Sequence, residues 1–88
     1  MANYSVELTR QAERQLTNAP KADRQRLIAA LQMLAMTPWP NGCRKLSGYN
    51  NLFRVRVGSY RIIYEIIEAR IVIRVLKIGH RKDVYRAL

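Results

Sequence analysis

The sequence has few cysteines, histidines and acidic residues. Its 88 residues include one Cys, one His and six Asp plus Glu, against sixteen Lys plus Arg. A single cysteine, Cys43, cannot form an internal disulfide, which favours a reducing compartment. One His and one Cys do not make a zinc ligand set, and no two carboxylates are placed for acid–base work. We therefore expect neither a metal nor a cofactor.

The sequence also lacks long hydrophobic runs. No apolar run approaches the roughly 18 residues of a membrane-spanning helix, and the N-terminus lacks the basic-then-apolar layout of a signal peptide. Nevertheless, 49% of the residues are hydrophobic and three are proline, a composition typical of a folded chain. The length predicts a single domain over residues 1–88. We expect a cytoplasmic protein with no membrane partner.

Two helices are predicted in the first half of the chain, after a short strand. Residues 4–8 alternate as a strand does, and Thr9 is a candidate N-cap for a helix carrying Ala12 and Leu16. Pro20 suits the first turn of a second helix. In that helix, apolar residues recur at helical spacing, namely Leu27, Ile28, Leu31, Leu34 and Ala35.

Three strands are predicted in the second half, over 52–58, 60–67 and 70–78, with hairpin turns at 58–59 and 68–70. Residues 81–88 are expected to form a short helical turn. The order β-α-α-β-β-β followed by a short helix predicts an α+β fold. Two N-terminal helices would pack on one face of a mostly antiparallel four-stranded sheet.

Strand alternation predicts which residues lie on the open face of this sheet. Phe53, Val55 and Val57 would face the helices, leaving Arg54 and Arg56 opposite. The strand over 60–67 is apolar on both sides and is expected to be central. Its tyrosines, Tyr60 and Tyr64, are expected to pack rather than bind a ligand. The hairpin register would bring Arg61 near Arg56.

The cationic residues of the central segment lack acidic neighbours. No Asp or Glu falls between Asp23 and Glu65, whereas seven Lys or Arg do. Arginines interleaved with aromatic residues suit RNA, because guanidinium groups match phosphates and aromatic rings stack on bases. The competing interpretation is an ordinary solvated sheet face. The net charge of +10 supports a polyanionic partner and says little about the fold.

Several segments form a pattern by their order and spacing: residues 4–8, the helix with Ala12 and Leu16, the helix ending before Thr37, residues 44–48, Phe53-Arg54-Val55-Arg56-Val57-Gly58-Ser59-Tyr60-Arg61-Ile62-Ile63-Tyr64-Glu65 and Gly79-His80-Arg81-Lys82-Asp83-Val84-Tyr85. Together they resemble the RelE/ParE toxin superfamily and more closely its RelE-like messenger-RNA-cleaving branch. The resemblance implies the fold of RelE-like microbial ribonucleases. It also implies a type II toxin that enters the A site of the 70S ribosome, contacts 16S ribosomal RNA and cuts messenger RNA there.

The resemblance assigns candidate roles to single residues. Arg61 matches the family's phosphate-binding arginine, Arg81 the proposed acid at the leaving oxygen, and Tyr85 the tyrosine that stacks on a base. Arg54 and Arg56 stand where the best-known member has lysines, one of them its proposed base. His80 is chemically the best proton shuttle in the chain, since an ordinary imidazole titrates near pH 6.5. Peripheral RNA contacts are expected from Arg44, Lys45 and Lys82.

The resemblance also implies a partner. We expect a RelB-like antitoxin that is acidic and folds as it binds, giving a heterodimer or heterotetramer. The alternative function is that of the ParE branch, a non-enzymatic inhibitor of DNA gyrase on the same fold. Retention of Arg61, Arg81 and Tyr85 favours the endoribonuclease.

Overall fold

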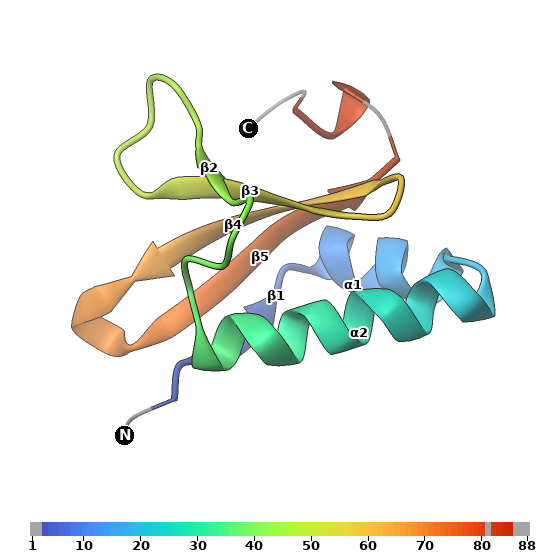
Figure 1. The fold of residues 1–88 in the computed structure, drawn as a ribbon, viewed down its shortest axis with the longest axis horizontal. Coiled ribbons are helices and arrows are strands. Elements are labelled where there is room, and N and C mark those ends of the chain that lie inside the picture. Colours follow the sequence, from blue (N-terminus) through green and yellow to red (C-terminus); the bar gives the residue numbers. More distant parts are fainter. Residues whose placement is uncertain (1–2, 81, 86–88) are drawn as a thin grey trace.

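The computed structural model describes residues 3–80 and 82–85. Two helices lie beneath a five-stranded sheet of order β1-β5-β4-β3-β2, in which β1 is parallel to β5 and the other pairs are antiparallel (Figure 1). The elements are β1 (Ser5–Leu8), α1 (Arg10–Asn18), α2 (Lys21–Met36), β2 (Arg44–Lys45), β3 (Leu52–Val57), β4 (Tyr60–Ile67), η1 (Glu68–Arg70), β5 (Val72–Gly79) and η2 (Lys82–Tyr85).

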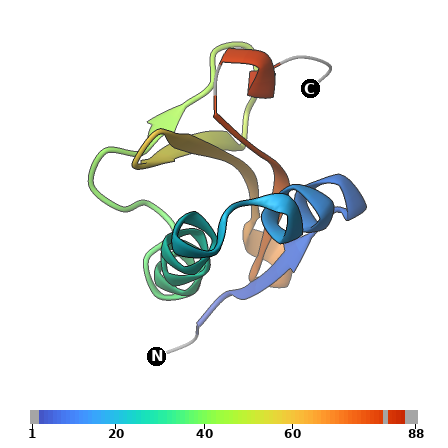
Figure 2. The same cartoon turned by 90° about the vertical axis from the view of Figure 1, so that its right-hand side faces the viewer.

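Both helices cover the same face of the sheet, as predicted (Figure 2). Thr9 is the N-cap of α1, since its hydroxyl accepts from the Ala12 N–H at 3.1 Å. Pro20 occupies the N-cap position of α2, one residue before the helix begins, rather than its first turn. The buried stripe of α2 is made by Leu27, Leu31 and Leu34.

One residue of the expected apolar stripe is exposed. Ile28 is 40% exposed and lines an apolar surface hollow together with residues of β1 and α1. The helix therefore buries a narrower face than the sequence periodicity predicts.

The central strand is β4, as predicted from its apolar residues on both faces. Tyr60, Ile62, Tyr64 and Ile66 belong to the main core beneath the helices. The Tyr64 hydroxyl donates to the Pro38 carbonyl at 2.9 Å and so ties the loop after α2 to the sheet. Ile63 is also fully buried, on the other face. Both tyrosines are therefore packing residues, as expected.

The sheet has five strands where four were predicted. The additional strand, β2, is two polar residues long, so neither alternation nor hydrophobicity reveals it. It forms because Arg44 and Lys45 pair with Arg54 and Phe53 of β3. The turn before β5 also differs, since 68–70 forms a 3-10 turn closed by Ile71 at a φ of 55°. For a β-branched residue this left-handed conformation is strained, and β5 consequently begins at Val72.

Two side chains from the region of α1 form hydrogen bonds with the backbone of β5. The Thr9 hydroxyl donates to the Leu76 carbonyl at 2.8 Å, and the Gln15 side-chain oxygen accepts from the Ile78 N–H at 2.8 Å. The ladder between β4 and β5 also shifts register between Ile63 and Tyr64. These contacts hold the last residues of β5 in a defined place, which matters because the candidate site lies at that end.

Candidate active site

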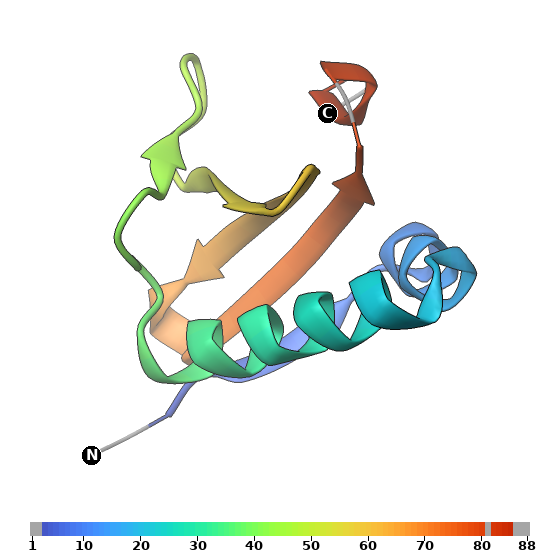
Figure 3. The same cartoon turned by 45° about the vertical axis from the view of Figure 1, so that its right-hand side comes forward.

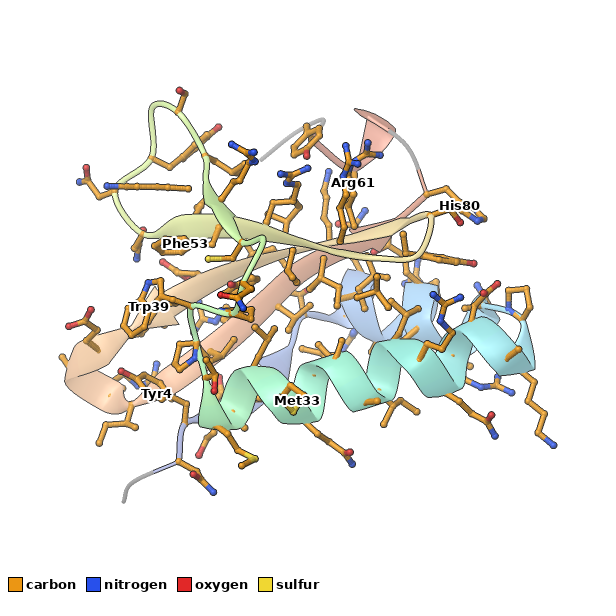
Figure 4. All side chains as sticks on the ribbon, viewed as in Figure 1. Tyr4, Met33, Trp39, Phe53, Arg61 and His80 are labelled. Atoms are coloured by element: carbon orange, nitrogen blue, oxygen red, sulfur yellow. The ribbon has the colours of Figure 1, made fainter. Side chains whose placement is uncertain are left out.

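Strand register places five cationic residues on the sheet face opposite the helices. One row runs from Arg44 through Arg54 and Ile63 to Lys77, and the next runs from Arg56 through Arg61 to Gly79. We call Arg44, Arg54, Arg56, Arg61 and Lys77 the cationic face. Figure 4 shows Arg61 rising from the sheet on the side away from α2. The predicted proximity of Arg56 and Arg61 is confirmed, since they are directly opposite in the β3–β4 ladder.

The described partner of the Arg61 guanidinium is a main-chain carbonyl. Its Nη1 donates to the His80 carbonyl at 3.3 Å. Its Nε is buried and has no hydrogen-bond partner among the residues that the structure describes. Gly79 lies across the ladder from Arg61, so no side chain stands between the guanidinium and this carbonyl. Because buried donors are nearly always satisfied, the Arg61 Nε is a candidate donor to a ligand.

A hollow of about 270 Å³ opens beside Arg61, at the turn between β3 and β4. It is lined by Arg56, Gly58, Ser59, Tyr60, Arg61 and His80. Gly58 has a φ of 61°, and a Cβ there would lie 2.7 Å from the Arg26 guanidinium. The backbone conformation of this turn therefore favours glycine, and the Arg26 side chain of α2 packs against it. Arg26 adds another cation near the hollow.

His80 lies at the end of β5, with its ring stacked on Tyr60. The two ring centroids are 4.2 Å apart and the planes differ by 29°. Tyr60 belongs to the core on the helix side, whereas its neighbour Arg61 points to the opposite face. The structure thus brings the His80 backbone to Arg61 and engages the His80 ring with Tyr60.

The C-terminal turn η2 lies above the same sheet face (Figure 3). It contacts β4 and β5, and Val84 is buried where Gly79 leaves space: a Cβ on Gly79 would lie 3.3 Å from the Val84 Cβ. Tyr85 is half-buried in this turn. Arg81 lies outside the described residues, as does the side chain of Lys82.

The two residues of β2 lie on different faces. Arg44 shares a ladder row with Arg54 on the cationic face, whereas Lys45 is opposite Phe53, whose ring packs toward the core. Both side chains are exposed. The sequence predicted the same role for both residues, a peripheral contact with RNA. The structure places them on different faces of the sheet.

Lys77 is a member of the cationic face that the sequence reading missed. Lys77 is 9% exposed and pairs with Ile63 in the β4–β5 ladder. Its side chain interacts with another group of the protein. Simple alternation along β5 would place Lys77 on the same face as Ile73 and Val75, which is the core face. The shift in pairing at Leu76 turns Lys77 to the opposite face, and alternation in the sequence does not reveal such a shift.

The three strand arginines have no described carboxylate beside them. Among the described side chains, none lies within ion-pair distance of Arg54, Arg56 or Arg61; the surface pairs are formed elsewhere, by Glu65 with Arg74 and by Glu7 with Arg70. No group of three or more His, Cys, Asp or Glu in the described chain could hold a metal ion. The arrangement is chemically suited to binding a phosphodiester through guanidinium groups.

No helix in the described part of the chain is long and apolar enough to cross a membrane.

Comparison with known proteins identifies the family. The sequence model described as "ParE toxin of type II toxin-antitoxin system, parDE" matches residues 6–85. The chain belongs to the RelE/ParE toxin superfamily.

Individual relatives place it near the RelE members of that superfamily. Toxin RelE3 of Methanocaldococcus jannaschii is 43% identical over 42 residues, which span 48% of this chain and 46% of that toxin. The RelE chain in the RelE-RelB complex of Pyrococcus horikoshii OT3 is 32% identical with a TM-score of 0.80, over 91% of this chain and 97% of that one. The RelBE2 complex of Mycobacterium tuberculosis gives 25% identity and a TM-score of 0.80, over 90% and 99%.

These likenesses confirm the predicted fold. The RelE/ParE toxin therefore has the two-helix, mostly antiparallel sheet architecture of its relatives, with a cationic face above it.

Proposed function

We propose that this RelE-like toxin cuts messenger RNA in the ribosomal A site. The observation that carries the proposal is the state of Arg61. Its guanidinium rests against a neutral carbonyl, its Nε has no acceptor in the described structure, and Arg56 stands directly opposite. Such a group keeps its full charge for a ligand, and the ligand it fits is a phosphate.

RNA supplies its own nucleophile for this reaction. The 2′-OH attacks the adjacent phosphorus and releases its proton to water, the bond to the 5′-oxygen breaks as that oxygen is protonated, and the products are a 2′,3′-cyclic phosphate and a free 5′-OH. The intermediate is a dianionic phosphorane. Preorganised donors aimed at such developing charge are worth about 3–4 kcal/mol each, so Arg61 and Arg56 would supply the main stabilisation.

Base binding and proton transfer complete the proposed site. Tyr85, in the turn above the cationic face, would stack on a base of the message. Arg81 would protonate the leaving 5′-oxygen. Arginine is a poor base because its guanidinium stays protonated, so Arg54 and Arg56 do not replace the lysines of the best-known relative in proton removal. We therefore expect slow cleavage of free RNA and a strong dependence on alignment by the ribosome.

The proposed partner is a RelB-like antitoxin, as in the RelE-RelB complex of Pyrococcus horikoshii. An acidic segment that folds on binding would cover Arg54, Arg56 and Arg61 or displace residues 81–88. The complex would be a heterodimer or heterotetramer, and the toxin would act in the cytoplasm, where its ribosomal target is found. An inhibited complex that leaves both the arginines and the C-terminal turn uncovered would contradict this mode of inhibition.

The test is to induce the toxin briefly and map the 5′ ends of cellular messenger RNA. We expect new ends in phase with codons within translated regions, each bearing a 5′-OH. In a purified system, translated message should be cut far faster than the same RNA without ribosomes. Equal rates on the two substrates would contradict ribosome dependence.

A second candidate is inhibition of DNA gyrase, because the matching family description names the ParE toxin. The same induction experiment separates the two functions. Gyrase-linked DNA breaks with intact transcripts would establish the ParE-like activity and remove the nuclease proposal.

A further inference from the structure

The ends of β4 and β5 next to the β3–β4 turn are joined by a ring stack. The last ladder pair is Arg61 with Gly79. The next residues outward are Tyr60 and His80, and their rings stack at a centroid distance of 4.2 Å. The stack thus extends the strand pairing one step beyond the backbone ladder. Tyr60 is 7% exposed and anchored in the main core, while His80 is exposed and follows the strand.

The same histidine supplies the group that holds Arg61. Its carbonyl oxygen accepts the Arg61 Nη1–H at 3.3 Å. A carbonyl orients a guanidinium without neutralising it, which a carboxylate would do. The position of this carbonyl depends on the end of β5, where regular pairing has stopped. Restraint of that end by the Tyr60–His80 contact therefore restrains the arginine.

We propose that Tyr60 and His80 are positioning residues for Arg61. Their stacked rings fix the end of β5, and the His80 carbonyl then orients the guanidinium toward the phosphate. In this role the imidazole acts through ring stacking and does not transfer a proton. Successive residues of a strand point to opposite faces, so the ring on Tyr60 lies on the helix side while Arg61 serves the cationic face. The inference rests on the proposed role of Arg61.

The test compares variants that keep or remove the ring, using single-turnover cleavage of ribosome-bound message at saturating toxin. An aromatic pair is worth about 0.5–1.5 kcal/mol, so His80→Ala and Tyr60→Leu should slow cleavage about twofold to twelvefold. Ribosome affinity should be unchanged. His80→Phe and Tyr60→Phe keep a ring and should recover most of the wild-type rate, with the same pH–rate profile.

Proton transfer by His80 predicts a different pattern. General acid–base groups contribute about 10²- to 10⁴-fold, so His80→Ala would lose at least about a hundredfold, and His80→Phe would be equally impaired and lose one limb of the pH profile. That result would overturn the positioning role. Thermal unfolding of each variant identifies any that loses its fold, and the phenylalanine pair remains informative if Tyr60→Leu does.

A double-mutant cycle with Arg61→Lys tests whether His80 acts through Arg61. Lysine lacks the guanidinium fork, so adding His80→Ala should then cost little more. A full additional loss would show that His80 acts independently and would overturn the inference.

The last measurement does not depend on RNA cleavage. The Arg61 Nε–H signal is followed by NMR in the free toxin. We expect it to broaden or exchange faster with water in His80→Ala and to be restored in His80→Phe. An unchanged signal in His80→Ala would refute the positioning even if the toxin cuts RNA. If the wild type cuts no message, the function proposal fails and this signal still decides whether the ring stack orders Arg61.

Discussion

The two ends of strand β4 differ in how their charged side chains are paired. Near its C-terminal end, Glu65 lies opposite Arg74 on β5 and accepts from the Asn51 amide at 3.0 Å, with an Arg74–Glu65 separation of 4.0 Å. At its N-terminal end, Arg61 lies opposite Arg56 on β3, and the guanidinium meets a carbonyl. At the C-terminal end, a carboxylate and a guanidinium are therefore paired with each other. At the N-terminal end, two guanidinium groups of the same charge lie opposite each other.

This difference supports the proposal that the N-terminal end of β4 binds a ligand. Opposite charges across a strand pair contribute roughly 0.2–1 kcal/mol, and like charges directly opposite are destabilising. A sheet selected for stability alone would therefore place a carboxylate at position 56 or 61. In the proposed function, a phosphate between the two guanidinium groups would make the unfavourable pair favourable. The predictions below break or sharpen this contrast, beginning with the largest effect.

Removal of Arg61 should have the largest effect on activity. Arg61→Ala deletes a donor aimed at the scissile phosphate, and we expect cleavage on the ribosome to fall about 10²- to 10³-fold. Thermal stability should change little, since the guanidinium supports no core packing. Arg74→Ala is the matched control at the other end of the same sheet, and its cleavage rate should stay at the wild-type level. An Arg61→Ala toxin that still arrests growth fully would contradict the nuclease assignment.

Reversal of charge at Arg56 should separate stability from activity. In Arg56→Glu the introduced carboxylate faces Arg61, so unfolding should become harder by roughly 0.2–1 kcal/mol. Cleavage should fall by about tenfold or more, because the carboxylate occupies the guanidinium that binds phosphate. Chemical denaturation and single-turnover cleavage measure the two quantities. Arg56→Gln, which removes charge without adding a partner, should lower activity without the gain in stability. A more active Arg56→Glu toxin would refute the assignment of this end to an anion.

The two residues of β2 lie on different faces of the sheet, and we expect smaller effects from their substitution. Arg44→Ala should weaken ribosome binding about twofold to fivefold and reduce the salt dependence of binding by about one ion. Lys45→Ala should have a smaller effect, because its side chain lies on the Phe53 side of the strand. Affinity measured across a salt series checks both. Equal effects would mean that both residues make only diffuse contacts, as the sequence indicated.

The last prediction concerns stability at high pH. Burial, with a lesser contribution from Cys43, raises the pKa of the Tyr64 hydroxyl well above its usual value of 10.0. Stability from this shift is fully present below the usual tyrosine range and is lost as the pH rises toward the folded-state pKa, since the unfolded chain releases the proton first. Tyr64→Phe should therefore flatten the alkaline loss of stability. It should also cost about 1–2 kcal/mol near neutral pH, because the Pro38 carbonyl loses its donor. Tyr49→Phe, at an exposed tyrosine, should do neither.

The sequence by itself determined the order of the main elements and the faces of the strands. Alternation in 53–57 put Arg54 and Arg56 opposite the core, and the Gly58 turn fixed the pairing of Arg56 with Arg61. These features are local, since they depend on strand period and hairpin geometry. The roles of Arg61, Arg81 and Tyr85 came from the family resemblance and stay predictions.

The tertiary structure decided what joins segments distant in the chain. The two residues of β2 form a strand because β3 offers them an edge, and Lys77 reaches the cationic face through the irregular β4–β5 ladder. The contacts of His80 with Tyr60 and Arg61 join residues about twenty positions apart. No local pattern encodes such contacts, because they arise when strands with their own periodicities are brought together by the core they share. The sequence supplied the arginines, and the tertiary fold decided which of them keep their charge free for a ligand.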